Sequence, residues 1–207
     1  MRAIFIFLVL LIVIAMAVPA TFAVRFWMES ASILARAEQS GAVRTPAARG
    51  RLSAVERTIA MDEFRDTWRT HAVPCRTAAF LWADLTMDDA PSGVSVSQKV
   101  ATAILSERRG TSIRWQIRRL VLACQLEQRF DDPQLLRMWL ATASFGQDVV
   151  GIESAAQAIF GKPSAELNAE ESAKLAALLR APSLRGQPER WAERARAIQE
   201  RIAAPAN

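Results

Sequence analysis

The sequence predicts an all-α domain behind one N-terminal transmembrane helix, and three observations indicate this fold class. Hydrophobic residues make up 51% of the 207 positions, while Gly (8) and Pro (9) are few, as in folded helical proteins. Residues 3–24 carry no charge. Between 132 and 183, apolar residues recur at helical spacing. A chain of this length suffices for one domain with a sizeable core and an anchor.

The uncharged N-terminal segment is long enough to cross a bilayer. A helix that rises ~1.5 Å per residue covers the roughly 30 Å hydrocarbon core with about 20 residues. Arg2 and Arg25 bracket the segment. A cleaved signal peptide is the alternative, because Ala15 and Ala17 have the spacing of a small-residue cleavage site. The apolar run continues past that site, which favours an anchor.

These features divide the chain into three parts. We predict a transmembrane signal-anchor over 1–25, a juxtamembrane helix and linker over 26–53, and a folded domain over 54–207. Phe26 and Trp27 follow the apolar span directly, where aromatic side chains commonly lie at the level of the lipid headgroups.

The net charge of +5 comes almost entirely from Arg, because Lys occurs only at positions 99, 162 and 174. A planar guanidinium suits phosphate and carboxylate groups. By charge alone, the partner is an anionic membrane surface, a lipid pyrophosphate, a glycan carboxylate or nucleic acid. An anchored or secreted domain leaves the cytoplasm, so we predict no nucleic-acid partner.

The two cysteines leave two interpretations open. In a domain outside the cytoplasm, Cys75 and Cys124 are able to form a disulfide. Cys124 also falls on the apolar face of a predicted helix, where a lone Cys is usually a small buried hydrophobe.

The segment from 132 to 183 predicts three helices, each with its own boundary residues. The first is an apolar run that Gly146 ends, made of Leu135, Leu136, Met138, Trp139 and Leu140. The second continues at helical spacing to Gly161, which suits the left-handed position after a helix. The third begins at Asn168, a polar cap, with the carboxylate of Glu171 able to reach back to it.

Two further amphipathic helices flank these three. Upstream, RRGTSIRWQIRRLVLACQLEQRF has one apolar stripe, formed by Ile113, Ile117, Leu120, Val121, Cys124 and Leu126. Downstream, QPERWAERARAIQERIAA has one side formed by Trp191, Arg194, Ile198 and Ile202.

Two stretches, WLATASFG and GIESAAQAIFGKPSAELNAEESAKLAALLRAPS, resemble the peptidoglycan glycosyltransferases of glycosyltransferase family 51, which polymerise lipid II. The resemblance covers roughly 54–203. It implies a lysozyme-like helical fold on the outer, periplasmic face of the cytoplasmic membrane, held there by a single span. It also implies lipid II or a nascent glycan strand as ligand, other cell-wall synthesis proteins as partners, and a divalent cation, for which the sequence has no evident ligand cluster.

The family motif EDxxFxxHxG carries a Glu that acts as general base, and its counterpart here depends on the alignment. Counting back from His71 places Phe64 at the Glu position, and Phe cannot move a proton. A two-residue insertion instead places Asp62 and Glu63 at the acidic positions, which makes them the candidate catalytic side chains. The alternative is that both are ordinary solvated charges of a helix.

Residues 93–99, GVSVSQK, lie where the family carries GSTITQQ. Hydroxyl and amide groups at this place would hydrogen-bond the disaccharide and its pyrophosphate. The candidate substrate-binding residues are Ser95, Ser97, Gln98 and Lys99.

The family motif RKxxE supplies a second carboxylate, and this chain lacks it. No acidic residue occurs between Ser112 and Gln125, and the Glu position is taken by Arg118 or Arg119. Together with Arg114, these two arginines are candidates for binding a pyrophosphate or anionic headgroups. An ordinary solvated basic face is the alternative.

We therefore expect a membrane-anchored, diverged family member that binds lipid II or nascent glycan, with catalysis reduced or lost. The first alternative is an active monofunctional polymerase that uses Glu63 or Asp62 as base. The second is a structural partner in an envelope assembly that binds no ligand.

Overall fold

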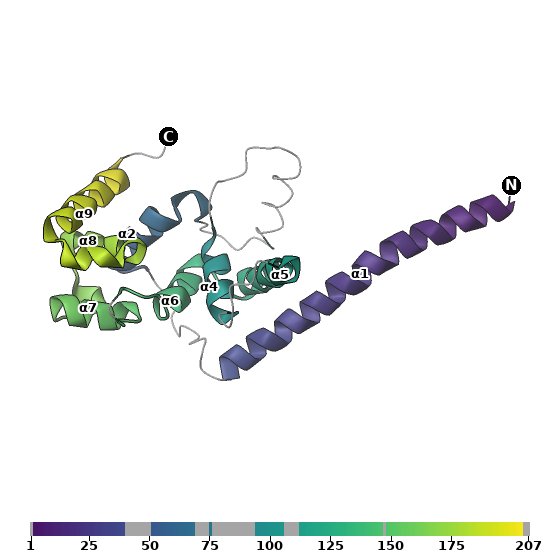
Figure 1. Ribbon diagram of the computed structural model, residues 1–207, viewed down its shortest axis with the longest axis horizontal. Coiled ribbons are helices and arrows are strands. Elements are labelled where there is room, and N and C mark those ends of the chain that lie inside the picture. Colours follow the sequence, from purple (N-terminus) through teal and green to yellow (C-terminus); the bar gives the residue numbers. More distant parts are fainter. Residues whose placement is uncertain are drawn as a thin grey trace.

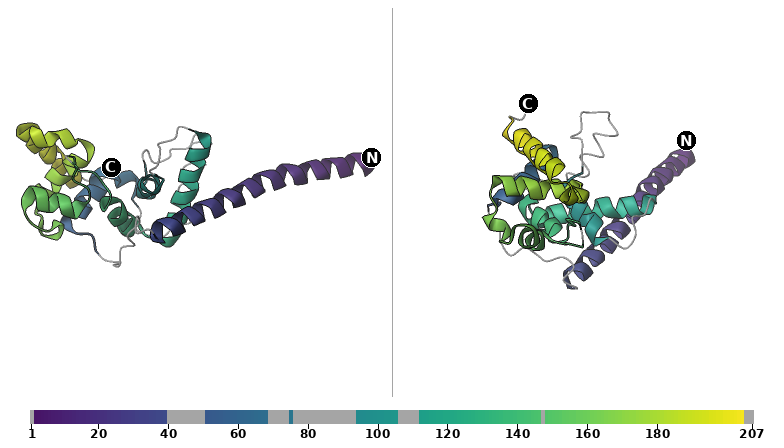
Figure 2. Two further views of the ribbon diagram at one scale, coloured as in Figure 1. Left: turned by 60° about the horizontal axis from the view of Figure 1, so that its bottom comes forward. Right: turned by 60° about the vertical axis from the view of Figure 1, so that its left-hand side comes forward.

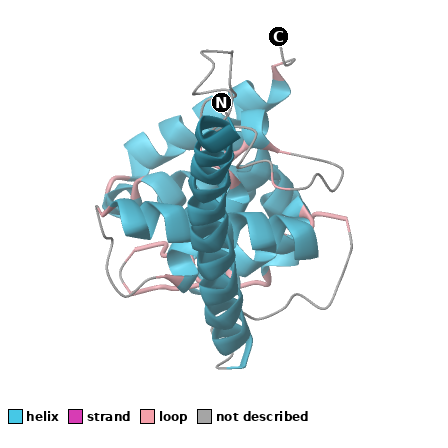
Figure 3. Cartoon of the chain, turned by 90° about the vertical axis from the view of Figure 1, so that its right-hand side faces the viewer, coloured by secondary structure: helices cyan, strands magenta, loops and turns pink. Residues whose placement is uncertain are grey.

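The computed structural model describes residues 2–39, 51–68, 75, 94–105, 112–146 and 148–204, with side chains from residue 21 onward except that of Asp66. Within these ranges every regular element is a helix, and one isolated antiparallel bridge joins Ser144 to Val150 (Figure 3). The described part therefore confirms the all-α class.

Helix α1 (Arg2–Gln39) is one long helix that projects from a compact helical body (Figure 1). Its inner end packs along α5 (Ile113–Arg129), and Leu34 is buried in the core. Within the described residues, no helix is long and apolar enough to cross a membrane. Most of the predicted transmembrane segment, 1–25, lies outside the side chains that the structure describes.

The remaining helices form two packed groups. Helix α8 (Ala169–Arg180) packs on α2 (Ala54–Glu63) and on α9 (Pro188–Ala203), while α4 (Val96–Ile104) packs on α5 and on α6 (Asp132–Leu140). The two groups lie at opposite ends of the body, α8 and α9 at one end and α4 and α5 at the other (Figure 2, left). The other elements are α7 (Ile152–Phe160) and three short 3₁₀ turns, η1 (Arg65–Thr67), η2 (Ser164–Glu166) and η3 (Pro182–Gly186).

Local capping chemistry fixes several of these boundaries. Asn168 accepts a hydrogen bond from the backbone N–H of Glu171, whose carboxylate accepts one from the N–H of Asn168, both at 2.9 Å. This confirms the predicted start of the third helix in the 132–183 segment. Gly161 follows α7 with φ +71°, which confirms the predicted left-handed position.

Phe64, which one alignment placed at the position of the base, is a core residue. Its ring is 2% exposed and meets the ring of Trp139 edge-on, with centroids 5.3 Å apart. Phe64 therefore joins the end of α2 to α6 and contributes packing, not chemistry.

The predicted apolar stripe of α5 is only partly correct. Leu122 and Leu126 are fully buried, but Ile113 is 78% exposed and Ile117 is 36% exposed. The reason is that Ile113 and Ile117 do not reach the core but line a cavity with Phe22 and Phe26 of α1.

The structure joins Cys75 and Cys124 in a disulfide, with Cα atoms 4.5 Å apart. Of the two interpretations that the sequence left open, pairing is therefore the one observed. His71 lies outside the described residues.

Candidate functional site

The two candidate bases lie at the end of α2, between α8 and α9. The side chain of Asp62 has no exposed surface, and its Oδ1 lies 2.8 Å from Nη1 of Arg201 on α9. Glu63, with a side chain 10% exposed, forms an ion pair with Nε of Arg180 on α8. The hydrogen bond to Glu63 raises the pKa of Arg180 above the usual value for arginine, so that guanidinium stays charged.

This arrangement constrains the chemistry of both carboxylates. A general base must come within hydrogen-bond reach of the proton that it removes. Asp62 is covered and Glu63 faces a guanidinium, so both carboxylates are engaged by arginines within the protein. Their catalytic role stays a prediction, and it requires one of these ion pairs to open.

The candidate hydroxyls lie at the start of α4 and face inward. Ser95 caps this helix, accepting a hydrogen bond from the backbone N–H of Gln98 at 3.4 Å. The Oγ atoms of Ser95 and Ser97 are 2.7 Å apart, and Ser97 donates to Oε1 of Glu127 on α5 at 2.6 Å. Ser95 and Ser97 are 0% exposed and Glu127 is 1% exposed. These two hydroxyls therefore join α4 to α5 inside the protein.

Two candidate cations are half-buried: Arg119 lies beside this network, and Lys99 lies on the side of α4 that faces α6. Arg119, one of the two arginines that the alignments place at the position of the missing second carboxylate, donates to Oε1 of Gln98 at 3.4 Å and stacks 5.6 Å from the ring of Trp115. Burial lowers the pKa of Arg119 from the usual arginine value. The ammonium of Lys99 lies 5.3 Å from the ring centroid of Trp139. Lys99 and Arg119 thus provide positive charge on neighbouring helices.

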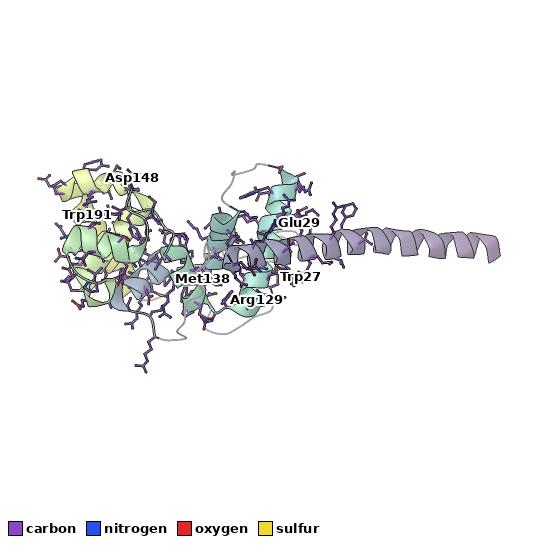
Figure 4. The ribbon with its side chains drawn as sticks, turned by 90° about the horizontal axis from the view of Figure 1, so that it is seen from below. Trp27, Glu29, Arg129, Met138, Asp148 and Trp191 are labelled. Carbon is purple, nitrogen blue, oxygen red and sulfur yellow. A yellow bond between two sulfur atoms is a disulfide. The ribbon has the colours of Figure 1, made fainter. Side chains whose placement is uncertain are left out.

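The other two candidate arginines point toward α1. Arg118 forms an ion pair with the carboxylate of Glu29, and Nη2 of Arg114 lies 3.8 Å from the same carboxylate. Glu29 lies on the inner part of α1 (Figure 4). The predicted site is therefore divided among several places. Ser95, Ser97, Gln98 and Arg119 come together, whereas Lys99 faces α6. Arg114 and Arg118 face α1, and the two carboxylates at the end of α2 face α8 and α9.

Sequence reasoning missed the partners that complete these clusters: Glu29, Glu127, Arg180 and Arg201. One signal was available for Glu127, which lies four residues after the apolar Ala123 and seven after Leu120 and so shares the stripe of α5 that faces the body. No comparable local signal identifies the arginines, because their pairs span more than 115 residues.

The family resemblance implies a divalent cation. The described residues contain no group of three or more His, Cys, Asp or Glu side chains that could hold a metal ion. The adjacent carboxylates Asp62 and Glu63 already face Arg201 and Arg180.

Comparison with known proteins identifies the family. Residues 53–203 match the family model described as transglycosylase. The chain is 36% identical to penicillin-binding protein 1C of Escherichia coli over 141 residues, 68% of this chain and 18% of that protein. It is 33% identical to penicillin-binding protein 1A of Aquifex aeolicus over 113 residues, 53% of this chain and 15% of that protein.

A third relative, the biosynthetic peptidoglycan transglycosylase of Acinetobacter baumannii, is 31% identical over 90 residues, 44% of this chain and 40% of that protein. In all three cases the matched segment spans less than half the length of the relative. The family model covers most of the chain and includes all the helices from α2 to α9 that the structure describes. The chain therefore belongs to the transglycosylase family.

Proposed function

We propose that this protein is a membrane-anchored, diverged peptidoglycan glycosyltransferase that binds lipid II or nascent glycan in cell-wall synthesis, with catalysis reduced or lost. Family membership supports the ligand class, since two of its relatives are penicillin-binding proteins and a third is a biosynthetic peptidoglycan transglycosylase. The observation that carries the loss of catalysis is the burial of Asp62 against Arg201.

The cations of α4 and α5 suit the pyrophosphate of such a ligand. Lys99 and Arg119 are half-buried and lie on adjacent packed helices, where desolvation strengthens attraction to phosphate. An arginine, Arg118 or Arg119, replaces a carboxylate of the family motif, a change that favours an anion at this point and removes an acid or base.

Reduced catalysis follows from what the carboxylates contact. A positioned general base contributes ~10²–10⁴-fold to a rate. Here the two candidate bases are held by Arg180 and Arg201, and the second acidic position holds a guanidinium that stays protonated at neutral pH. Positive charge for the leaving phosphate remains, whereas both candidate bases that the structure describes are paired with arginines.

Three features support attachment to the outer face of the cytoplasmic membrane. Residues 3–24 carry no charge and have the length of a single span. The disulfide between Cys75 and Cys124 suits an oxidising compartment. The inner end of α1 packs on the domain through the buried Leu34, so a span formed by the outer part of this helix would hold the domain close to the membrane.

The test is lipid II polymerisation by the detergent-solubilised full chain, with the variants Asp62→Asn and Glu63→Gln beside it and lipid II binding measured in parallel. We expect bound lipid II without glycan chains. Glycan chains that disappear in one variant would establish an active polymerase whose base is the substituted residue. If the protein neither forms glycan chains nor binds lipid II, the remaining function is a structural role in an envelope assembly.

A further inference from the structure

Six of the eight large apolar side chains that the described part exposes lie on two neighbouring helices; Val94 and Val150 are the other two. Ile113 is 78% exposed, Met28 67% and Phe22 56%; Val24, Trp27 and Ile117 belong to the same set. All six lie on α1 or α5, which pack against each other. Phe22, Ile113 and Ile117 line one cavity, whereas Val24 and Met28 line another. Exposed apolar side chains that gather in this way are typical of an interaction surface.

A cavity of about 300 Å³ lies between these helices; we call it the α1–α5 groove. Its apolar lining consists of Phe22 and Phe26 from α1 and of Ile113 and Ile117 from α5. Arg25 and Arg114 are part of the same lining, one from each helix. The groove therefore combines an apolar floor with two guanidinium groups.

The charges around the groove favour an anion. The carboxylate of Glu29 also lines it, but Arg118 already forms an ion pair with that carboxylate. Arg114 lies farther away, at 3.8 Å, and its side chain is 60% exposed. Arg25 is exposed as well. Arg25 and Arg114, one from each helix, thus give the groove two exposed guanidiniums, of which Arg114 has only a long contact to Glu29.

We propose that the α1–α5 groove binds one anionic phospholipid, with part of an acyl chain between Phe22 and Ile113 and the phosphate at Arg25 and Arg114. This inference rests on the membrane attachment proposed above. The uncharged segment 3–24 runs into the groove at Phe22, so a helix that crosses the bilayer brings the groove to the level of the headgroups. A lipid bound there fixes how the domain is oriented on the membrane.

Charge argues against a second copy of the chain as the occupant. A symmetric contact through the groove brings Arg25 and Arg114 of one copy toward the same residues of the other, and like charges in an apolar contact oppose association. A phosphate beside a hydrocarbon chain matches both kinds of lining group.

The test is native mass spectrometry of the full chain in an uncharged detergent, titrated with phosphatidylglycerol or phosphatidylcholine. We expect one tightly retained phosphatidylglycerol and weaker retention of phosphatidylcholine. The variant Arg114→Gln should weaken phosphatidylglycerol binding about fivefold, because one basic side chain near a headgroup contributes about that factor. Ile113→Asn should weaken both lipids. Both side chains are mainly exposed, so these variants should retain the fold.

Val150→Asn is the matched control, because Val150 is an exposed apolar residue, 53% exposed, outside the groove. Equal retention by Ile113→Asn and Val150→Asn would overturn the proposal, and so would equal affinity for the two lipids. A doubled mass that disappears in Ile113→Asn would assign the groove to a second copy. Displacement of the phospholipid by equimolar lipid II would assign it to the substrate chain. Failure to bind lipid II at the cations of α4 and α5 leaves the phospholipid result unchanged, so the two proposals fail separately.

Discussion

Arg201 of the last helix lies 2.8 Å from Asp62 at the end of α2, and the Asp62 side chain has no exposed surface. The two paired residues are more than 130 positions apart in the chain. Arg180 reinforces it by holding the neighbouring Glu63. A carboxylate that the family motif offers as a base is thus part of the packing between α2, α8 and α9.

The substitution Asp62→Asn should lower the free energy of unfolding by about 2 kcal/mol, because it leaves Arg201 without its carboxylate at a largely buried site. Arg201 is 39% exposed and regains some hydration, which keeps the loss below that of a fully buried pair. Urea unfolding followed by circular dichroism measures the change. Glu200→Gln, at an exposed neighbour on α9, is the control and should change stability by less than about 0.5 kcal/mol. An unchanged midpoint for Asp62→Asn would mean that the pair does not stabilise the fold.

The substitution Ser97→Ala should lower the free energy of unfolding by about 1–3 kcal/mol, because it removes a hydrogen bond to the buried carboxylate of Glu127. A double-mutant cycle with Glu127→Gln isolates the interaction. We expect a coupling energy of at least ~1 kcal/mol, whereas Ser154→Ala on the exposed side of α7 should show none with Glu127→Gln. If the stability losses of Ser97→Ala and Glu127→Gln simply add in the double variant, the hydrogen bond between the two side chains is contradicted.

Glu171 makes stability depend on pH. The hydrogen bond from Lys162, followed by that from the backbone N–H of Asn168, lowers the pKa of Glu171 below its ordinary value. Because the folded-state pKa is depressed, the stabilisation is fully present above the ordinary glutamate pKa and is lost as pH falls through the depressed value. Glu171→Gln should therefore flatten the fall in unfolding free energy below about pH 4.5.

The matched control for this pH profile is Glu170→Gln. Glu170 pairs with Lys174 at 2.6 Å, but its side chain is 67% exposed, and exposed pairs contribute little. A profile for Glu171→Gln that parallels the profile of the unsubstituted protein would contradict the capping role. Asn168→Ala should lower the free energy of unfolding by about 1 kcal/mol at neutral pH, because it removes the side chain that caps the same helix.

The disulfide should be present in protein isolated without reductant from the cells that make it. Under denaturing conditions without reductant, thiol labelling should find neither Cys75 nor Cys124 free. Reduction should lower stability by about 2–4 kcal/mol, because the bond closes a loop across 49 residues. The double variant Cys75→Ala and Cys124→Ala is the control, because it has no disulfide to reduce. Adding the reductant should not change the stability of this variant. Labelling of both thiols would contradict an oxidising location.

The sequence predicted the helices best where their ends carry local signals. Asn168 with Glu171, and Gly161 after α7, depend on hydrogen bonds and backbone conformation within one turn, and both are confirmed. The exposure of Ile113 was not predictable, because periodicity gives a face of a helix but does not say how far the helix extends past its neighbours.

The candidate site was predictable in its residue types but not in their pairing. The motif match placed Ser97, Gln98 and Arg119 in one region, and the structure brings them together. The pairs of Asp62 with Arg201 and of Glu29 with Arg118 depend on tertiary packing between helices distant in sequence. Such pairs leave no periodic or local pattern, so a single sequence does not indicate them.

The proposed function requires that the protein holds a lipid-linked disaccharide without polymerising it. Fluorescent lipid II added to the full chain tests this in one sample, because anisotropy reports binding while gel electrophoresis reports chain length. We expect anisotropy to rise to a stable plateau with no glycan chains formed. Glycan chains that lengthen with time, and that Asp62→Asn abolishes while lipid II binding persists, would contradict the claim and show that the pair of Asp62 and Arg201 opens to release an active base.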